Sequence, residues 1–248
     1  MTPITSHDLL PELSVVVPVL DEAENVEALV AEVEAAMTSA QVLAELIVVD
    51  DGSRDETLPR LLHCRTACAW LRVLHRSVPE GQSSAMHAGI AAARAPYTAT
   101  LDGDLQNDPA DLPRLLEIVR SGEADMAQGR RSRRRDPLVR KASSWVGRSA
   151  RRLLLGDRIT DTGCSTRVMK TQLARQFPLQ YQGMHRFLPI YARMLGVRVV
   201  EVPVAHRRRH AGATKYGIGN RALAGLIDCF AVRWMGRRLR GVATDEQE

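Results

Sequence analysis

The chain has 248 residues, of which 45% are hydrophobic and 25% charged, a globular balance that excludes extensive disorder. No uncharged apolar run reaches about 18 residues, and no basic segment followed by an apolar one opens the chain, so we expect neither a transmembrane helix nor a signal peptide. The net charge of +5 hides an asymmetry: residues 1–128 hold 8 basic and 21 acidic side chains, and residues 129–248 hold 26 basic and 8 acidic ones. An acidic half can hold a cation, and a basic half can face phosphates, anionic lipid or nucleic acid.

The first 130 residues alternate between short β-branched runs and helical patterns. Strands are expected at residues 13–19, 45–50, 71–74, 97–101 and 124–128, and helices at residues 24–37, 56–67, 83–94 and 112–121. This rhythm predicts βαβ units and a mostly parallel sheet flanked by helices, the α/β class.

The second half begins with an arginine-rich run and is less regular. The patterns predict a helix at 138–155, a loop at 161–167, a helix at 184–195, a strand at 197–204, a basic loop at 207–216 and an amphipathic helix at 218–239. No repeat or low-complexity linker divides the chain. We therefore expect one catalytic domain over residues 1–216, followed by an amphipathic helix and tail over 217–248 with no transmembrane segment.

Acidic loops follow three of the predicted strands. Glu22 follows the first strand, Asp50 and Asp51 end the second, and Asp102 and Asp104 follow the fourth. Each loop alone is well explained by turns and helix caps. Together they should meet at the carboxyl edge of the sheet, where α/β proteins bind ligands. The motifs of dinucleotide sites, P-loops and nucleophile elbows are absent from the sequence.

The triplet Asp102-Gly103-Asp104 places two carboxylates at a glycine bend, where they can converge on one divalent ion. Hard oxygen ligands suit Mg²⁺ or Mn²⁺, and such an ion keeps positions open for substrate phosphates. A lone Asp-x-Asp is weak evidence, but its place after a strand that ends on an acidic edge strengthens the metal hypothesis.

Motifs along most of the chain, from Leu13 to Tyr216, form an ordered series. They are Val15 to Pro18 with Glu22 and Asn25, Val49 to Ser53 with Asp55 and Thr57, Gly81 with Ala85 and Gly89, Leu101 to Gln106 with Pro109, Gly129 with Arg131, Asp161 to Arg167, His185 to Phe187, Glu201 to Val204 and Arg209 to Tyr216. In this order the sequence resembles family 2 glycosyltransferases with the GT-A fold. The similarity is to the branch of dolichol-phosphate mannosyltransferases and bacterial polyprenyl-phosphate glycosyltransferases. Asp21 stands where that family often has Asn, and Thr214 where it often has Ser.

The resemblance implies roles for individual residues. Those implied for the donor are Pro18, Leu20 and Glu22 lining the nucleoside pocket, Asp50 contacting base or ribose with Asp51 beside it, and Asp102, Asp104 and Gln106 approaching the metal and the diphosphate. Arg131, Arg209 and Lys215 are expected at donor or acceptor phosphates, and Asp161 is expected to act at the substrate. We assign catalysis to Asp102, Asp104, Arg131 and Lys215.

The implied reaction moves a sugar such as mannose or glucose from a UDP- or GDP-sugar to a polyprenyl or dolichyl phosphate, with inversion. The alternative is a soluble family 2 transferase acting on a hydroxyl of a glycan or glycolipid. That reaction would need a general base, for which Asp161 and His185 are the candidates. Nucleic acid is not an expected partner, because aromatic residues make up only 4% of the chain and do not interleave with the basic ones.

The C-terminal amphipathic pattern carries Leu223, Leu226, Ile227, Phe230 and Trp234 on one face and a cluster of arginines at its end. Such a helix can lie on a membrane surface. It can equally pack on the domain core or in a homodimer interface. We expect a cytoplasmic protein, peripheral at the cytoplasmic face of the membrane.

Overall fold

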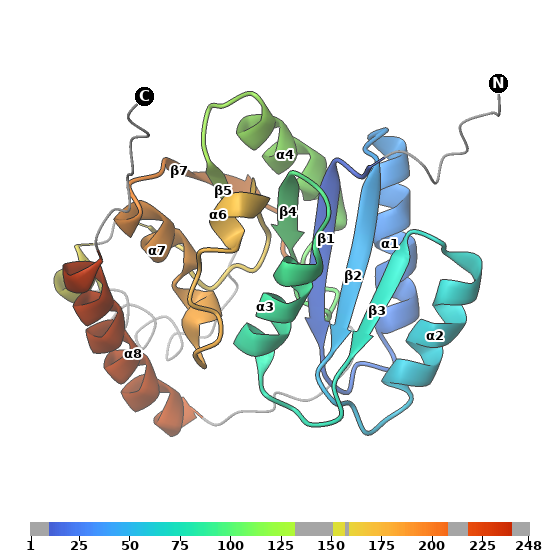
Figure 1. The fold of residues 1–248 in the computed structure, drawn as a ribbon, viewed down its shortest axis with the longest axis horizontal. Helices are drawn as coiled ribbons and strands as arrows, with labels where there is room; N and C mark the ends of the chain where they lie inside the picture. Colours follow the sequence, from blue (N-terminus) through green and yellow to red (C-terminus); the bar gives the residue numbers. More distant parts are fainter. Residues whose placement is uncertain (1–9, 132–150, 157–158, 208–217, 240–248) are drawn as a thin grey trace, which may run out of the picture.

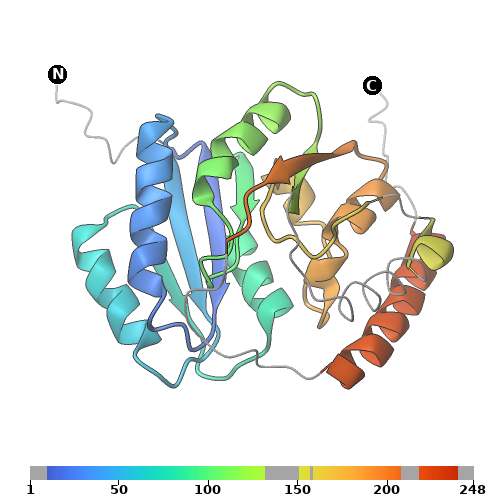
Figure 2. The ribbon, with the colours of Figure 1, turned by 180° about the vertical axis from the view of Figure 1, so that it is seen from behind.

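The computed structural model describes residues 10–131, 151–156, 159–207 and 218–239. They form a seven-stranded sheet in the order β3-β2-β1-β4-β6-β5-β7 with helices on both faces (Figures 1 and 2). The strands are β1 (Leu13–Val19), β2 (Ala44–Asp50), β3 (Leu71–His75), β4 (Tyr97–Thr100), β5 (Met126–Arg131), β6 (Arg167–Lys170) and β7 (Val199–Val204). All neighbouring pairs are parallel except those that β6 makes with β4 and β5.

Two apolar layers sandwich the sheet, because successive side chains of a strand point to opposite faces. Val15 and Val17 of β1 pack with α1 (Val26–Ser39), α2 (Thr57–Ala67) and α4 (Leu112–Arg120). Val16 packs in the opposite layer with α3 (Gln82–Ala92), α6 (Thr171–Ala174) and α7 (Leu188–Met194). Burial on both faces explains why β1 and β2 read as continuous apolar runs.

The expected α/β class with a mostly parallel sheet is confirmed, and the predicted elements of the first half occur within a few residues of their expected bounds. The expected helix at 184–195 is divided into a 3-10 turn η2 (Met184–Arg186) and α7, in which Pro189 lies in the first turn. The expected loop at 161–167 runs into β6, the antiparallel strand. Of the expected helix at 138–155, residues 151–155 are helical and the rest lies outside the described residues, as does the expected domain boundary at 216.

The C-terminal helix is present as α8 (Ile218–Arg238) and lies beside α7. No helix in the described part of the chain is both long and apolar enough to cross a membrane.

Candidate active site

The predicted acidic loops lie together at the carboxyl edge of β1, β2 and β4, the lower edge of the sheet in Figure 1. The first two loops are tied to each other. The Asp21 N–H donates to Ser53 Oγ (2.8 Å), and Asp21 Oδ1 accepts from the Arg54 N–H (2.8 Å). The Glu22 N–H donates to the Thr57 hydroxyl at 2.8 Å. The backbone of Asp21 is left-handed, with φ 48°. Asp and Asn tolerate this conformation better than other non-glycine residues, which accounts for an Asp where the resembling family often has Asn.

The end of β1 carries the three residues expected at the nucleoside, Pro18, Leu20 and Glu22. Pro18 pairs with Val49 of β2 within the sheet, and Leu20 and Glu22 follow directly. The Glu22 carboxylate accepts from Asn25 Nδ2 at 2.6 Å. The three residues thus surround the end of β1, next to the end of β2.

The carboxylates of Asp50 and Asp51 are buried and hold neighbouring loops. Asp50 accepts from the Ser53 N–H (3.1 Å) and lies 2.8 Å from His75 Nδ1. Asp51 accepts from the Gly81 N–H (2.7 Å) and from the Glu80 N–H (3.1 Å). Asp51 therefore fixes the loop that leads into α3, a structural role that the sequence did not suggest. The nucleoside contact expected of Asp50 stays a prediction.

Asp102 and Asp104 flank Gly103 directly after β4. A side chain at Gly103 would lie 2.6 Å from Val19 Cγ1, so only glycine lets this loop approach the end of β1. The next residue, Leu105, has a left-handed backbone with φ 59°, which is unusual for a bulky residue and indicates strain at the site. Burial, and then the nearby Asp104 carboxylate, raise the pKa of Asp102. A bound cation would offset both effects.

These residues fit a divalent cation that is completed by its substrate. In the described part of the chain, no three His, Cys, Asp or Glu side chains converge into a metal site. Mg²⁺ and Mn²⁺ need no such cage, since one or two carboxylates together with water and substrate phosphates suffice for them. Gln106 belongs to the same loop: its backbone N–H donates to Asp104 Oδ1 at 3.2 Å.

The segment after β7 is joined to this loop. The Arg207 N–H donates to the Gln106 carbonyl at 2.8 Å, and His206 forms a β-bridge with Asn107. The Arg207 guanidinium pairs with Asp108 at 2.7 Å. The basic loop predicted at 207–216 therefore starts beside the carboxylate pair. Its two expected phosphate ligands, Arg209 and Lys215, lie outside the described residues.

Arg131 and Asp161 are brought together as an ion pair. Arg131 Nε and Nη2 donate to the two Asp161 oxygens at 2.8 and 2.7 Å. Burial lowers the pKa of Arg131, but the hydrogen bonds and charge of Asp161 outweigh it and raise that pKa, so the guanidinium stays charged. The carboxylate of Glu201, in β7, accepts hydrogen bonds from the Asp161 and Thr160 N–H groups. Because a guanidinium has five N–H donors and this pair uses two, Arg131 can still meet a phosphate.

His185, one candidate base, lies where a base would be weak. Its Nδ1 is 2.7 Å from Ser83 Oγ, and burial, with Arg186 and Arg167 nearby, lowers its pKa to about 3. The imidazole is therefore neutral near pH 7 and poorly matched to general-base catalysis there.

Sequence reasoning missed the residues that support this site. Gln82 donates to Asp102 Oδ1 at 2.8 Å. Arg167 is fully buried, and its Nε and Nη2 donate to Gln128 Oε1 (2.7 Å) and the Thr162 carbonyl (3.0 Å). Arg167 ends one of the quoted motifs, so a signal existed for it. Gln82 looks like any polar residue at a helix start and gave none.

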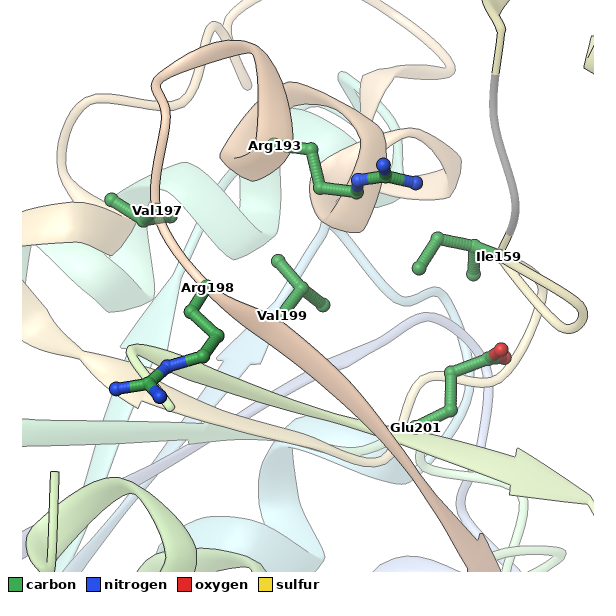
Figure 3. Close-up of a pocket in the computed structure, with 6 residues that line it drawn as sticks. All are labelled: Ile159, Arg193, Val197, Arg198, Val199 and Glu201. Atoms are coloured by element: carbon green, nitrogen blue, oxygen red, sulfur yellow. The ribbon is translucent and has the colours of Figure 1, made fainter. Parts of the chain in front are cut away.

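Two of the depressions on the described part of the surface are lined by neither Asp102 nor Asp104. One, of about 390 Å³, lies along β7 and is lined by Ile159, Arg193, Val197, Arg198, Val199 and Glu201 (Figure 3). The other, of about 340 Å³, lies between the starts of α1 and α2. It is lined mainly by the acidic side chains of Asp21, Glu22, Glu24, Asp55 and Glu56. The carboxylate pair stays the expected place of the chemistry, because two carboxylates at the carboxyl edge of the sheet suit a metal ion and a diphosphate.

Residues 14–180 match the family described as Glycosyl transferase family 2. The chain belongs to this family. It is 39% identical to a dodecaprenyl-phosphate galacturonate synthase of Rhizobium johnstonii over 233 residues. The matched region covers 91% of this chain and 68% of the relative. It is 32% identical to an undecaprenyl-phosphate 4-deoxy-4-formamido-L-arabinose transferase of Photorhabdus laumondii, covering 85% and 65%. The chain thus spans about two-thirds of the length of these relatives.

The fold of this family 2 glycosyltransferase is also seen in a mannosyltransferase of Pyrobaculum calidifontis, solved in complex with GDP-Man and Mn²⁺. The TM-score is 0.66 at 17% identity, over 91% of this chain and 64% of that one. The similarity confirms the GT-A architecture that the sequence predicted.

Proposed function

We propose that this glycosyltransferase moves a sugar from a UDP- or GDP-sugar to a polyprenyl phosphate, with inversion at the anomeric carbon. The observation that carries the proposal is the pairing of Asp102 and Asp104 at the sheet edge with the start of a basic loop, which Arg207 attaches to Gln106. The names of both relatives, each a transferase or synthase of a polyprenyl-phosphate sugar, support this acceptor.

In the proposed reaction an oxygen of the lipid phosphate forms a bond to the anomeric carbon. The bond from that carbon to the diphosphate oxygen breaks, and the nucleoside diphosphate leaves with the bonding electrons. A phosphate monoester has its second pKa near about 6, so it is largely dianionic at pH 7 and needs no base to take its proton. Cations beside the site are needed to gather the two phosphate groups.

The two candidate bases favour the phosphate acceptor over a sugar hydroxyl. His185 has a pKa of about 3, and the Asp161 carboxylate is paired with Arg131. A hydroxyl acceptor would require one of them to remove a proton near pH 7, which neither arrangement suits. A phosphate acceptor makes no such demand.

We assign Mg²⁺ or Mn²⁺ to Asp102 and Asp104, with Gln106 as a further oxygen ligand. When bound, the ion would stabilise the negative charge that grows on the diphosphate leaving group. The mannosyltransferase with the same fold was solved with Mn²⁺, which supports the choice of ion.

We also propose that α8 rests on the membrane that contains the acceptor. Cys229 and Val232 are buried, and Gly236 packs on Met194 of α7. The other side of the helix exposes large apolar side chains. Their exposed fractions are 41% for Leu226, 59% for Ile227, 54% for Phe230 and 62% for Trp234. The Arg238 guanidinium lies over the Trp234 ring, 5.8 Å from its centroid, so cations border the apolar stripe as they do on interfacial helices. The side chain of Leu223, expected on the same face, lies outside the described residues. A homodimer interface on this face is the competing proposal.

The deciding experiment is a screen of nucleotide sugars with and without a short polyprenyl phosphate, in which transfer to lipid is scored separately from hydrolysis. Lipid-linked sugar that forms only with the polyprenyl phosphate supports the proposal. Equal transfer to a water-soluble glycan, with a pH profile that reports a base, would replace it with the hydroxyl-acceptor reaction.

A further inference from the structure

The Asp102 carboxylate is held by two side chains from opposite halves of the chain. Gln82 Nε2 donates to Asp102 Oδ1 at 2.8 Å, and the Ser165 side chain makes a second hydrogen bond to the same carboxylate. Gln82 opens α3, whereas Ser165 lies 83 positions later, in the segment that leads into β6. Asp102 is therefore the point at which the two halves of the site meet.

Ser165 is itself fixed on several sides. Asn107 Nδ2 donates to Ser165 Oγ at 2.7 Å, and Thr100 Oγ1 donates to the Ser165 carbonyl at 2.6 Å. Because the Ser165 hydroxyl has a single proton and accepts from Asn107, that proton is the one that can be donated to Asp102. The side chain is buried, so water does not compete for this bond.

Gln82 is fixed by the helix that it begins. The Asp51 carboxylate accepts from the preceding Gly81 N–H at 2.7 Å, which anchors the start of α3 to the end of β2. The following residue, Ser83, lies 2.7 Å from His185 Nδ1, which ties the same turn to η2. The Gln82 amide thus reaches Asp102 from a helix end that is braced on two sides.

We propose that Gln82 and Ser165 are positioning residues that orient the Asp102 carboxylate toward the divalent cation. The inference rests on the proposed metal role of Asp102. Two donors from separate elements leave the carboxylate little freedom to rotate, so it meets the cation already aligned. Residues that orient a metal ligand in this way commonly contribute about 10- to 100-fold to metal affinity.

The test measures binding of UDP and GDP by calorimetry while Mn²⁺ is titrated, with no acceptor present. Gln82→Met removes the amide donor and keeps the side chain's length, and Gln82 is exposed, so the variant is expected to fold. We expect the Mn²⁺ concentration for half-maximal nucleotide binding to rise about 10-fold or more. Ser165→Ala, which acts from the other half, should give the same signature. Saturating Mn²⁺ should restore most of the binding in both variants.

Ser84→Ala is the matched control. Ser84 lies in the first turn of the same helix, and its hydroxyl bonds to Arg76 and Glu80 at 2.9 and 3.0 Å. A merely structural role for this turn would predict equal shifts in Ser84→Ala and Gln82→Met. Equal shifts in the two variants would overturn the inference. So would an unchanged Mn²⁺ requirement in Gln82→Met, provided that nucleotide binding by the wild-type protein depends on Mn²⁺.

The assay also separates this inference from the proposed function. Wild-type nucleotide binding that does not depend on Mn²⁺ would overturn both the metal assignment and the positioning role. Failure of the polyprenyl phosphate to accept sugar, with Mn²⁺-dependent binding intact and sensitive to Gln82→Met, would overturn only the acceptor.

Discussion

Gly103 offers a direct test of how the carboxylate pair is built, because the structure leaves no room for a side chain there. An added Cβ would lie 2.6 Å from Val19 Cγ1 and 3.6 Å from the Pro18 carbonyl oxygen. Ordinary carbon–carbon contacts are about 3.5–4.0 Å, so Gly103→Ala forces a displacement of about 1 Å. Val19 is buried in the core at the end of β1 and has little freedom to yield. The loop that carries Asp102 and Asp104 must therefore move.

We expect two measurable consequences of Gly103→Ala. Overpacking of this kind costs about 1–3 kcal/mol of unfolding free energy, which urea denaturation would detect. A displacement of about 1 Å of groups that position a substrate can cost about 10²-fold in rate, so turnover should fall as well. Mn²⁺-supported nucleotide binding should weaken in parallel.

Two further variants make this prediction falsifiable. Gly225→Ala adds the same methyl group to α8, where nothing lies within 4 Å, and should be neutral or stabilising by about 0.5–1 kcal/mol. Val19→Ala combined with Gly103→Ala removes the clashing methyl groups and should lose less stability than the sum of the two single changes. Strict additivity in the double variant, or wild-type behaviour of Gly103→Ala, would refute the steric reasoning.

Chelation of divalent ions, or Asp104→Ala, should lower turnover by at least about 10²-fold without unfolding the protein, and full activity in excess chelator would end the metal assignment. Lys215→Ala should lower kcat/KM by about 10²-fold or more with polyprenyl phosphate as acceptor, and Lys215→Arg should retain only part of the lost activity. A near-wild-type rate in Lys215→Ala would show that the basic loop at 207–216 is a solvated surface loop without a role in phosphate binding. Anionic vesicles should bind the protein, less so at high salt, and removal of residues 218–248 should abolish this binding; a folded truncation that still binds would move the contact elsewhere. Because the pKa of His185 is lowered from 6.5 to about 3, its contribution to the free energy of unfolding is full above pH 6.5 and is lost as the pH falls toward about 3. His185→Asn should therefore make the free energy of unfolding less dependent on pH over this range. An unchanged pH dependence would contradict the burial of His185.

The sequence was sufficient for the sheet and its acidic edge because both depend on local patterns. The apolar runs around Val16 and Val48 require strands that are buried on both faces, and carboxylates that follow parallel strands must share an edge. The antiparallel β6 could not be predicted in the same way. Its four residues, Arg167–Lys170, form a strand only because they fill the gap between β4 and β5, which is a property of the assembled sheet.

The partners of the site residues were likewise beyond the sequence. Arg131 and Asp161 were each predicted to act at the site, yet nothing in their spacing indicated that they pair with each other. Gln82 and Ser165 bond to Asp102 from positions 20 residues before it and 63 residues after it. Such contacts follow from tertiary packing, so a pattern read along the chain carries no trace of them.

Two carboxylates at the sheet edge, those of Asp55 and Asp102, have pKa shifts of opposite sign. Burial alone would raise the pKa of Asp55, but hydrogen bonds from Thr57 and Ala23 outweigh it and lower that pKa. Asp102 shows the opposite balance: burial and the charge of Asp104 outweigh the hydrogen bonds from Ser165 and Gln82 and the positive charge of Arg167, so its pKa is raised. A buried carboxylate that lies beside a second carboxylate is in a state that a divalent cation would stabilise. The acidic loops therefore have two roles: those after β1 and β2 hold the backbone together, and the loop after β4 keeps two carboxylates side by side where the diphosphate and its metal are proposed to bind.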